Sequence, residues 1–69
     1  MASHVFTAVI HKEELLYVAE CPEIGTVSQG QSIEEAVANL KEATELYLEE
    51  FAMPEVSRVL LTTFEATHA

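Results

Sequence analysis

The sequence predicts one small α+β domain over residues 1–69, with the element order β-β-β-α-β. Three observations favour this class: short segments rich in β-branched and aromatic residues, one long segment with apolar residues at helical spacing, and turn-forming residues between them. We expect an antiparallel meander of three strands, a fourth strand beside one edge, and one long helix on one face of the sheet. A chain of this length buries only about 60% of its unfolded surface, so the expected core is small.

The first two strands are expected at His4–Lys12 and Leu15–Glu20, because both segments alternate in side-chain type and are too short for typical helices. A turn at Glu13 and Glu14 separates them, so the strands should pair antiparallel. One face of the first strand carries Phe6, Ala8 and Ile10.

The second strand is expected to end at Cys21-Pro22-Glu23, because proline has no backbone N–H to give to a strand ladder. Ile24–Gln29 follows as a short third strand. Within it, Gly25 could mark a bulge or a close backbone approach, although a conformationally free glycine is the commoner explanation. Gly30 permits the change of direction into the helix.

The helix is expected from Ile33 to about Phe51, ending before Pro54. Ser32 and Glu35 have the spacing of a capping box, in which the serine hydroxyl accepts an amide of the first turn and the glutamate reaches back to the amide of the cap. The inner face is predicted from the three-and-four spacing of Ile33, Ala36, Val37, Leu40, Ala43, Thr44, Tyr47, Leu48 and Phe51.

Arg58–Ala66 has the composition of a strand, and a strand reached through a helix usually runs parallel to its neighbour. The second face of the sheet would then carry four candidate self-association residues: Val5, Val9, Val59 and Leu61. Because the single Cys21 excludes an internal disulfide, we expect a homo-oligomer, a dimer or a tetramer, to supply the missing burial. The lone thiol and the lack of a signal-peptide pattern favour the cytoplasm.

Charge is the strongest feature of the composition, with 12 acidic residues against 3 basic ones and a net charge of −9. Such a surface repels phosphate, so direct nucleic-acid binding is not expected and basic proteins are the favoured partners. The alternative interpretation is that the carboxylates only keep the protein soluble. The candidate partner-binding residues are Glu20, Glu23, Glu42, Glu45 and Glu49.

No catalytic, metal-binding or cofactor-binding constellation is expected, and the chain is not predicted to be an enzyme. The sequence has no aspartate, and its glutamates do not form the carboxylate cluster of a metal-dependent nuclease. His4 and His11 are expected on opposite faces of one strand. The neighbouring Glu20 and Glu23 should raise the pKa of the Cys21 thiol and keep it unreactive. No apolar stretch is long enough for a membrane span.

Four short motifs, at matching spacing between residues 6 and 48, resemble the pattern of the HicB-like antitoxin family. They are Tyr17–Glu23, Ser28–Gly30, Glu35-Ala36 and Asn39–Ala43. The resemblance implies a partial ribonuclease-H-like fold of β-β-β-α-β order without catalytic carboxylates. It also implies a function, the neutralisation of a small basic HicA-like toxin that cleaves messenger RNA.

Many members of that family also carry a C-terminal DNA-binding domain, whereas this sequence stops after the expected fourth strand. The part of the family role expected here is therefore antitoxin action in a type II toxin–antitoxin pair, without operator binding by this chain. The alternative is a stand-alone oligomeric module of the same fold that binds another protein or a ligand and has no toxin partner.

Overall fold

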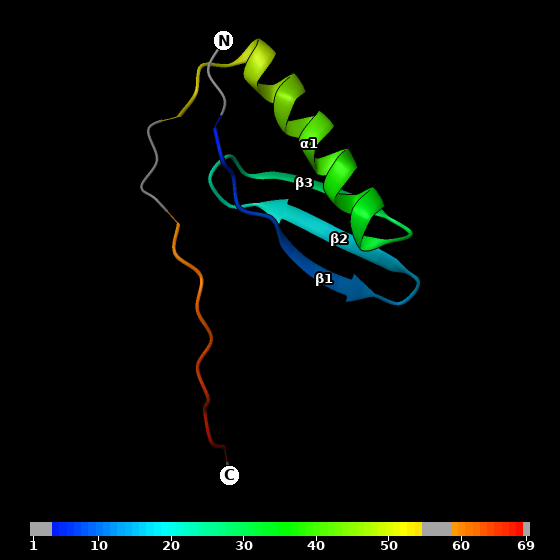
Figure 1. Cartoon of the computed structure of the whole chain (residues 1–69), viewed down its shortest axis with the longest axis vertical. Coiled ribbons are helices and arrows are strands. Elements are labelled where there is room, and N and C mark those ends of the chain that lie inside the picture. Colours follow the sequence, from blue (N-terminus) through cyan, green and yellow to red (C-terminus); the bar gives the residue numbers. More distant parts are fainter. Residues whose placement is uncertain (1–3, 55–58, 69) are drawn as a thin grey trace.

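Three antiparallel strands and one long helix form in the computed structural model, which describes residues 4–54 and 59–68. The elements are, in chain order, β1 (Val9–Glu13), β2 (Leu16–Cys21), β3 (Thr26–Gly30) and α1 (Ile33–Glu50). The strands lie in the order β1-β2-β3, and the helix crosses one face of the sheet (Figure 1). The predicted α+β class, the meander and the long helix are confirmed.

The β1–β2 hairpin pairs Val9 with Glu20 at one end and Glu13 with Leu16 at the other. Its two-residue turn is Glu14-Leu15, one position later than the sequence pattern indicated. Glu14 has a φ of 52°, a left-handed conformation that a non-glycine residue adopts at a cost of about 1–2 kcal/mol.

β1 begins at Val9, five residues later than the His4 predicted from composition. The reason lies on the opposite strand, where continuation of the register would place Pro22 across from Thr7. Because Pro22 has no N–H, the ladder cannot continue, and the N-terminal segment 4–8 is extended without being part of the sheet. The expected strand is therefore shortened at its start.

The β2–β3 connection closes on one carbonyl oxygen. The N–H groups of Ile24 and Gly25 both donate to the Cys21 carbonyl, at 3.3 and 2.7 Å. Gly25 has a φ of 95°, and a Cβ at this position would meet no atom within 4 Å. The glycine is therefore needed for its conformation and not for space, as the sequence predicted, and β3 starts only after it, at Thr26.

The helix begins where the capping pattern predicted. Ser32 is extended, and its hydroxyl accepts the N–H of Glu35 at 3.1 Å. The Glu35 carboxylate accepts from the N–H of Gln31 at 2.8 Å, one residue before the expected partner. Gly30, the last residue of β3, lies so close to this first turn that a Cβ would come within 2.6 Å of the Ala36 nitrogen. β3 and α1 can therefore approach this closely only without a side chain at Gly30.

The core consists of small side chains between α1 and the β2–β3 half of the sheet. The buried residues are Ala19, Cys21, Ala36, Leu40 and Thr44. The Thr44 hydroxyl is satisfied by a 2.7 Å hydrogen bond with the Thr26 hydroxyl, which joins the helix to β3. The helix packs most extensively on β3, then on β2, so the helix-facing side of β1 is left with less cover.

Three residues of the predicted inner helix face, Ile33, Val37 and Phe51, are exposed in the structure. A helix of 18 residues is about 27 Å long, whereas a strand of five or six residues spans only about 17–20 Å. Neither end of α1 can therefore be covered fully by the sheet. Val37 lies along the flank of α1, across from the N-terminal segment.

The fourth strand expected at Arg58–Ala66 does not form in the single chain. Arg58 lies outside the described residues, and 59–66 pair with no strand among the residues that the structure describes. Figure 1 shows 59–68 as an extended chain that runs clear of the sheet. A β-rich composition favours an extended backbone, but a strand is stable only with a paired edge and a covered face, and here the segment has neither.

Candidate functional site

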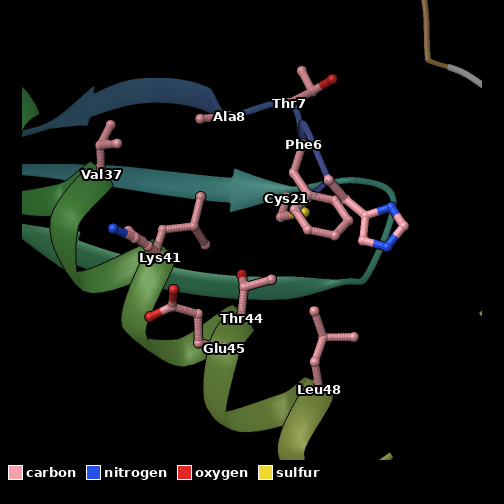
Figure 2. A pocket seen from close by; sticks show the side chains of 11 residues that line it. Phe6, Thr7, Ala8, Cys21, Val37, Lys41, Thr44, Glu45 and Leu48 are labelled. Carbon is pink, nitrogen blue, oxygen red and sulfur yellow. The ribbon is translucent and has the colours of Figure 1, made fainter. Parts of the chain in front are cut away.

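A groove of about 270 Å³ runs between the N-terminal segment and the flank of α1. Phe6 and Ala8 line one side, and Val37 and Leu48 line the other. In Figure 2 the Phe6 ring lies over Cys21, while Val37 and Leu48 mark the two ends of the groove along the helix. Its lining is mainly apolar, with Lys41 and Glu45 as charged members of the helix side. The sequence pattern had not indicated this groove.

The N-terminal segment, which forms one side of the groove, is held by the carboxylate of Glu23. This carboxylate accepts the Thr7 N–H at 3.1 Å and the Thr7 hydroxyl at 2.7 Å. These bonds, led by the one from the hydroxyl, hold the pKa of Glu23 below its usual value, against the opposing effect of burial. The N-terminal segment is thereby tied to the β2–β3 turn where the strand ladder has ended.

The Cys21 thiol at the floor of the groove is buried and donates to Glu23 Oε1 at 3.5 Å. Burial raises its pKa, and the Glu23 carboxylate adds to this effect, while the backbone N–H groups of Ile24 and Glu23 oppose it. The thiol is therefore protonated at neutral pH, a state with little nucleophilic reactivity. The predicted direction of the pKa shift is confirmed, but its main cause is burial and not the neighbouring carboxylates that the sequence indicated.

Three of the candidate partner-binding residues, Glu42, Glu45 and Glu49, lie together on the exposed face of α1. Their spacing of three and four residues places them on one side of the helix, opposite the buried Leu40 and Thr44. We call these three glutamates the acidic stripe. Among the described residues neither Lys12 nor Lys41 forms an ion pair with these glutamates, although Lys41 lies one helical turn from Glu45.

Leu46 lies beside the acidic stripe and is 55% exposed. Helical spacing places it next to Glu42 and Glu49, and Glu50 completes the surround on the other side. An exposed leucine ringed by carboxylates has the layout of an interface anchor with a charged rim. Leu46 was not among the residues predicted from the sequence, although an apolar residue off the predicted inner helix face is a usable indication.

The two other candidate glutamates are not part of the stripe. Glu20 lies on β2 between the buried Ala19 and Cys21, so its side chain points to the face of the sheet away from the helix. Glu23 lies at the β2–β3 turn, with its carboxylate engaged by Thr7. The five residues therefore fall into three separate locations, of which only the helix brings several together.

The four candidate self-association residues are also divided. Val5 is fully exposed on the N-terminal segment, and Val9 is partly exposed on β1, where its strand partner is Glu20. Val59 is half-buried and Leu61 exposed on the C-terminal segment. Val9 alone lies in the sheet, on the face opposite the helix, and residues 59–66, which pair with no described strand, do not place Val59 and Leu61 beside it.

Residue types that hold metals do not gather in the described part of the chain. No group of three or more histidine, cysteine, aspartate or glutamate side chains there is arranged to bind an ion. His11 is engaged with Glu13 at 2.8 Å, and His4 lies 6.1 Å from the Phe6 ring, measured between ring centroids. Within residues 4–54 and 59–68 there is also no helix with the length and hydropathy to cross a membrane.

Sequence comparison places these features in a family. The UPF0150 protein of Helicobacter pylori strain J99 is 48% identical to this chain over 54 residues, which cover 77% of this chain and 75% of that protein. The chain belongs to the UPF0150 family. No family model matches the chain, and no solved structure matches it either.

In this UPF0150 chain the most distinctive sequence motifs hold the fold together. Glu23 binds Thr7, Ser32 and Glu35 cap the helix, and the Asn39 amide donates to the Gln29 carbonyl at 2.8 Å. The acidic stripe and Leu46 lie mostly outside those motifs. The motif residues therefore account for the fold of the domain. The residues best placed to contact a partner are the acidic stripe and Leu46, on the outer face of α1.

Proposed function

We propose that this UPF0150 chain is the antitoxin of a type II toxin–antitoxin pair. In this proposal it neutralises a small basic HicA-like toxin, which cleaves messenger RNA, by binding it directly in the cytoplasm. The observation that carries the proposal is the acidic stripe, with Leu46 exposed beside Glu42 and Glu49 and no lysine paired to the carboxylates in the described structure. The motif resemblance to HicB-like antitoxins supports the same partner.

The proposed mechanism is occlusion. A protein that cleaves RNA must present positive charge to the phosphate backbone, and a row of carboxylates is complementary to that charge. Glu42, Glu45 and Glu49 repeat along about 10 Å of helix, while Leu46 offers an apolar contact that water leaves on binding. Carboxylates of the antitoxin then take the place of RNA phosphates, and no chemical step is needed from this chain.

The first experiment is co-expression with the small basic protein encoded by the adjacent gene. We expect the two proteins to co-purify and the purified complex to leave RNA uncleaved. The proposal is wrong if the mixed proteins do not associate, or if cleavage of RNA by the basic protein is unchanged by this chain.

Variants that replace glutamate by glutamine test which surface of the chain binds the toxin. Replacing Glu42, Glu45 and Glu49 by glutamine should weaken binding by about tenfold or more at low salt, since each exposed pair contributes roughly 0.2–1 kcal/mol. The matched control replaces Glu13, Glu14 and Glu34, which lie near the hairpin turn and the start of α1. Both variants lose three negative charges from the net −9, so an equal loss of affinity would exclude a specific stripe.

A leucine pair tests the apolar anchor. Leu46→Gln should weaken the complex by at least about tenfold, the effect of losing one contact of more than 1 kcal/mol. Leu15→Gln makes the same chemical change at a leucine in the hairpin turn that is 87% exposed. If the two variants bind the toxin equally well, Leu46 is not in the interface.

The second candidate is a stand-alone oligomeric module that binds another protein or a ligand and has no toxin partner. The groove beside Phe6 and Val37 favours it, because an apolar groove offers a binding surface that a purely electrostatic function does not use. A chain that self-associates and binds no basic protein, and whose gene has no neighbour encoding one, would support this alternative.

A further inference from the structure

The described chain leaves complementary surfaces uncovered at two places. One is the free edge of β1 with the groove beside it. The other is the C-terminal segment, in which Leu60 and Phe64 are 82% and 89% exposed and no strand is paired. A free edge and an unpaired apolar strand in the same chain are the two halves of a strand-exchange interface.

We infer that residues 59–66 of one copy add to the free edge of β1 of a second copy, and that the exchange is reciprocal. The occupant of the groove is thus the C-terminal segment of a partner copy of this chain. This inference goes beyond the proposed function, because it requires no toxin and concerns the purified chain alone.

The alternation of the segment matches the two faces that it would extend. Leu60, Thr62 and Phe64 share one side, and Val59, Leu61 and Thr63 share the other. With Leu60 and Phe64 directed to the helix side, they meet the groove beside Phe6, while Leu61 extends the face that carries Val9. Glu65 then points away from the groove. The opposite orientation would bring Glu65 towards the apolar groove, so it is disfavoured.

The dimensions also agree. Val37 and Leu48 are eleven positions apart on α1, which corresponds to about 16 Å along the groove. Leu60 and Phe64 are four strand positions apart, or about 13 Å. Two large apolar side chains at this separation fit within the groove length, one towards each end.

The distribution of charge also favours contact between the C-terminal segment and the region of β1. No glutamate occurs in residues 1–12 or 56–64. The first stretch contains most of β1 with its free edge, and the second contains most of the proposed fourth strand. Two copies with a net charge of −9 each repel one another over most of their surfaces. Contact between the two carboxylate-free stretches is where that repulsion is smallest.

The exit from the helix favours a partner copy over the segment's own sheet. Phe51 is extended, with φ −128° and ψ 148°, and no turn is formed at residues 52–54, which end in Pro54. Eight residues separate α1 from Val59 and reach at most about 28 Å, enough to cross to a neighbouring molecule. Residues 52–54 therefore leave the helix without a reverse turn that would direct the chain back to its own β1.

Proline substitution tests the exchanged strand. We expect the purified protein to self-associate in sedimentation equilibrium, at least as a dimer. An added strand that pairs on one edge directs only every second N–H to β1, so Thr62→Pro and Thr63→Pro are made separately. The one of the two that removes a ladder N–H from each exchanged strand should raise the dissociation constant of the dimer by about 30-fold. The matched control is Thr67→Pro, outside the segment, which should change it by less than about threefold. Circular dichroism checks that all three variants keep α1.

Nuclear Overhauser measurements on the unmodified protein decide between exchange and closure within one chain. In a dimer mixed from isotope-labelled and unlabelled copies, the Phe64 ring should show intermolecular contacts to the methyl groups of Val37 and Leu48. The inference is overturned by a monomeric protein at NMR concentrations, by contacts found only within one chain, or by Thr62→Pro and Thr63→Pro dimers that are both as tight as the original. Each of these outcomes leaves toxin binding open, so the two proposals fail separately.

Discussion

Glu23 holds Thr7 at two atoms, accepting its backbone N–H at 3.1 Å and its hydroxyl at 2.7 Å. The contact occurs where Pro22 would otherwise face Thr7 in the sheet and has no N–H to offer. The Glu23 side chain thus attaches the N-terminal segment to the sheet at a position where backbone hydrogen bonds between the strands do not continue. This bond also positions Phe6 at the side of the groove.

The Glu23–Thr7 contact predicts a pH dependence of stability. Because the folded state holds the pKa of Glu23 below the ordinary value of about 4.3, the contribution of this carboxylate is fully present above that pH. It is lost as the pH falls through the lowered folded pKa. Urea unfolding of the native protein between neutral and acidic pH should show this loss, together with reduced amide protection of Thr7.

The matched variant for this test is Glu23→Gln, which keeps the size of the side chain but cannot titrate. Its stability should be lower than that of the native protein at neutral pH, and the difference should shrink as the pH falls. Subtracting the two pH profiles removes the contribution of the other glutamates. A constant difference at all pH values would contradict the assigned role of the carboxylate.

The Cys21 thiol is predicted to react slowly. Its raised pKa and its burial both reduce the amount of accessible thiolate, so alkylation by iodoacetamide at neutral pH should be at least about tenfold slower in the folded protein than in urea. The unfolded protein is the internal control, since it has the same single cysteine. Equal rates in the two states would show that the groove floor opens readily.

The two glycines should differ in what alanine does to them. Gly25→Ala places a Cβ in open space at φ 95° and should cost about 1–2 kcal/mol from backbone strain alone. Gly30→Ala places a Cβ 2.6 Å from the Ala36 nitrogen, so the helix must move as well. We expect a cost of about 1–3 kcal/mol and altered amide shifts at the start of α1 only for Gly30→Ala. Unfolding curves and NMR spectra of both variants check this difference.

Salt should act in opposite directions on the two proposed interactions. Raising NaCl from about 0.05 M to about 0.5 M shortens the Debye length from roughly 14 Å to roughly 4 Å. Repulsion between two copies of net charge −9 is then screened, and self-association should tighten. Binding of a basic partner to Glu42, Glu45 and Glu49 should weaken. Sedimentation and binding assays at both salt concentrations show whether salt moves the two interactions in opposite directions, as expected, or in the same direction.

Local sequence patterns predicted the parts of the fold that depend on near neighbours. The serine cap at Ser32 and the buried side chains of Ala36 and Leu40 are confirmed. Each depends on residues within one turn, or on the periodicity of one element. Side-chain spacing is sufficient to predict such features.

The features that failed depend on pairing between distant segments. The start of the first strand was wrong because Pro22, on the opposite strand, ends the ladder at Thr7. The fourth strand was wrong for the single chain because composition gives residues 59–66 an extended preference but no partner edge. The groove and the position of Leu46 likewise follow from how α1 lies on the sheet, which periodicity alone does not define.

The free edge of β1 also bears on aggregation. Val5–Ile10 reads Val-Phe-Thr-Ala-Val-Ile, six residues of high strand propensity without charge, proline or glycine, and three of them, Val5, Ala8 and Val9, are exposed in the described chain. Segments of this type stack into amyloid fibrils when nothing covers them. If a protease removed the residues beyond Pro54, the proposed natural cover would be lost. Such a fragment would be expected to nucleate fibrils from its N-terminal segment.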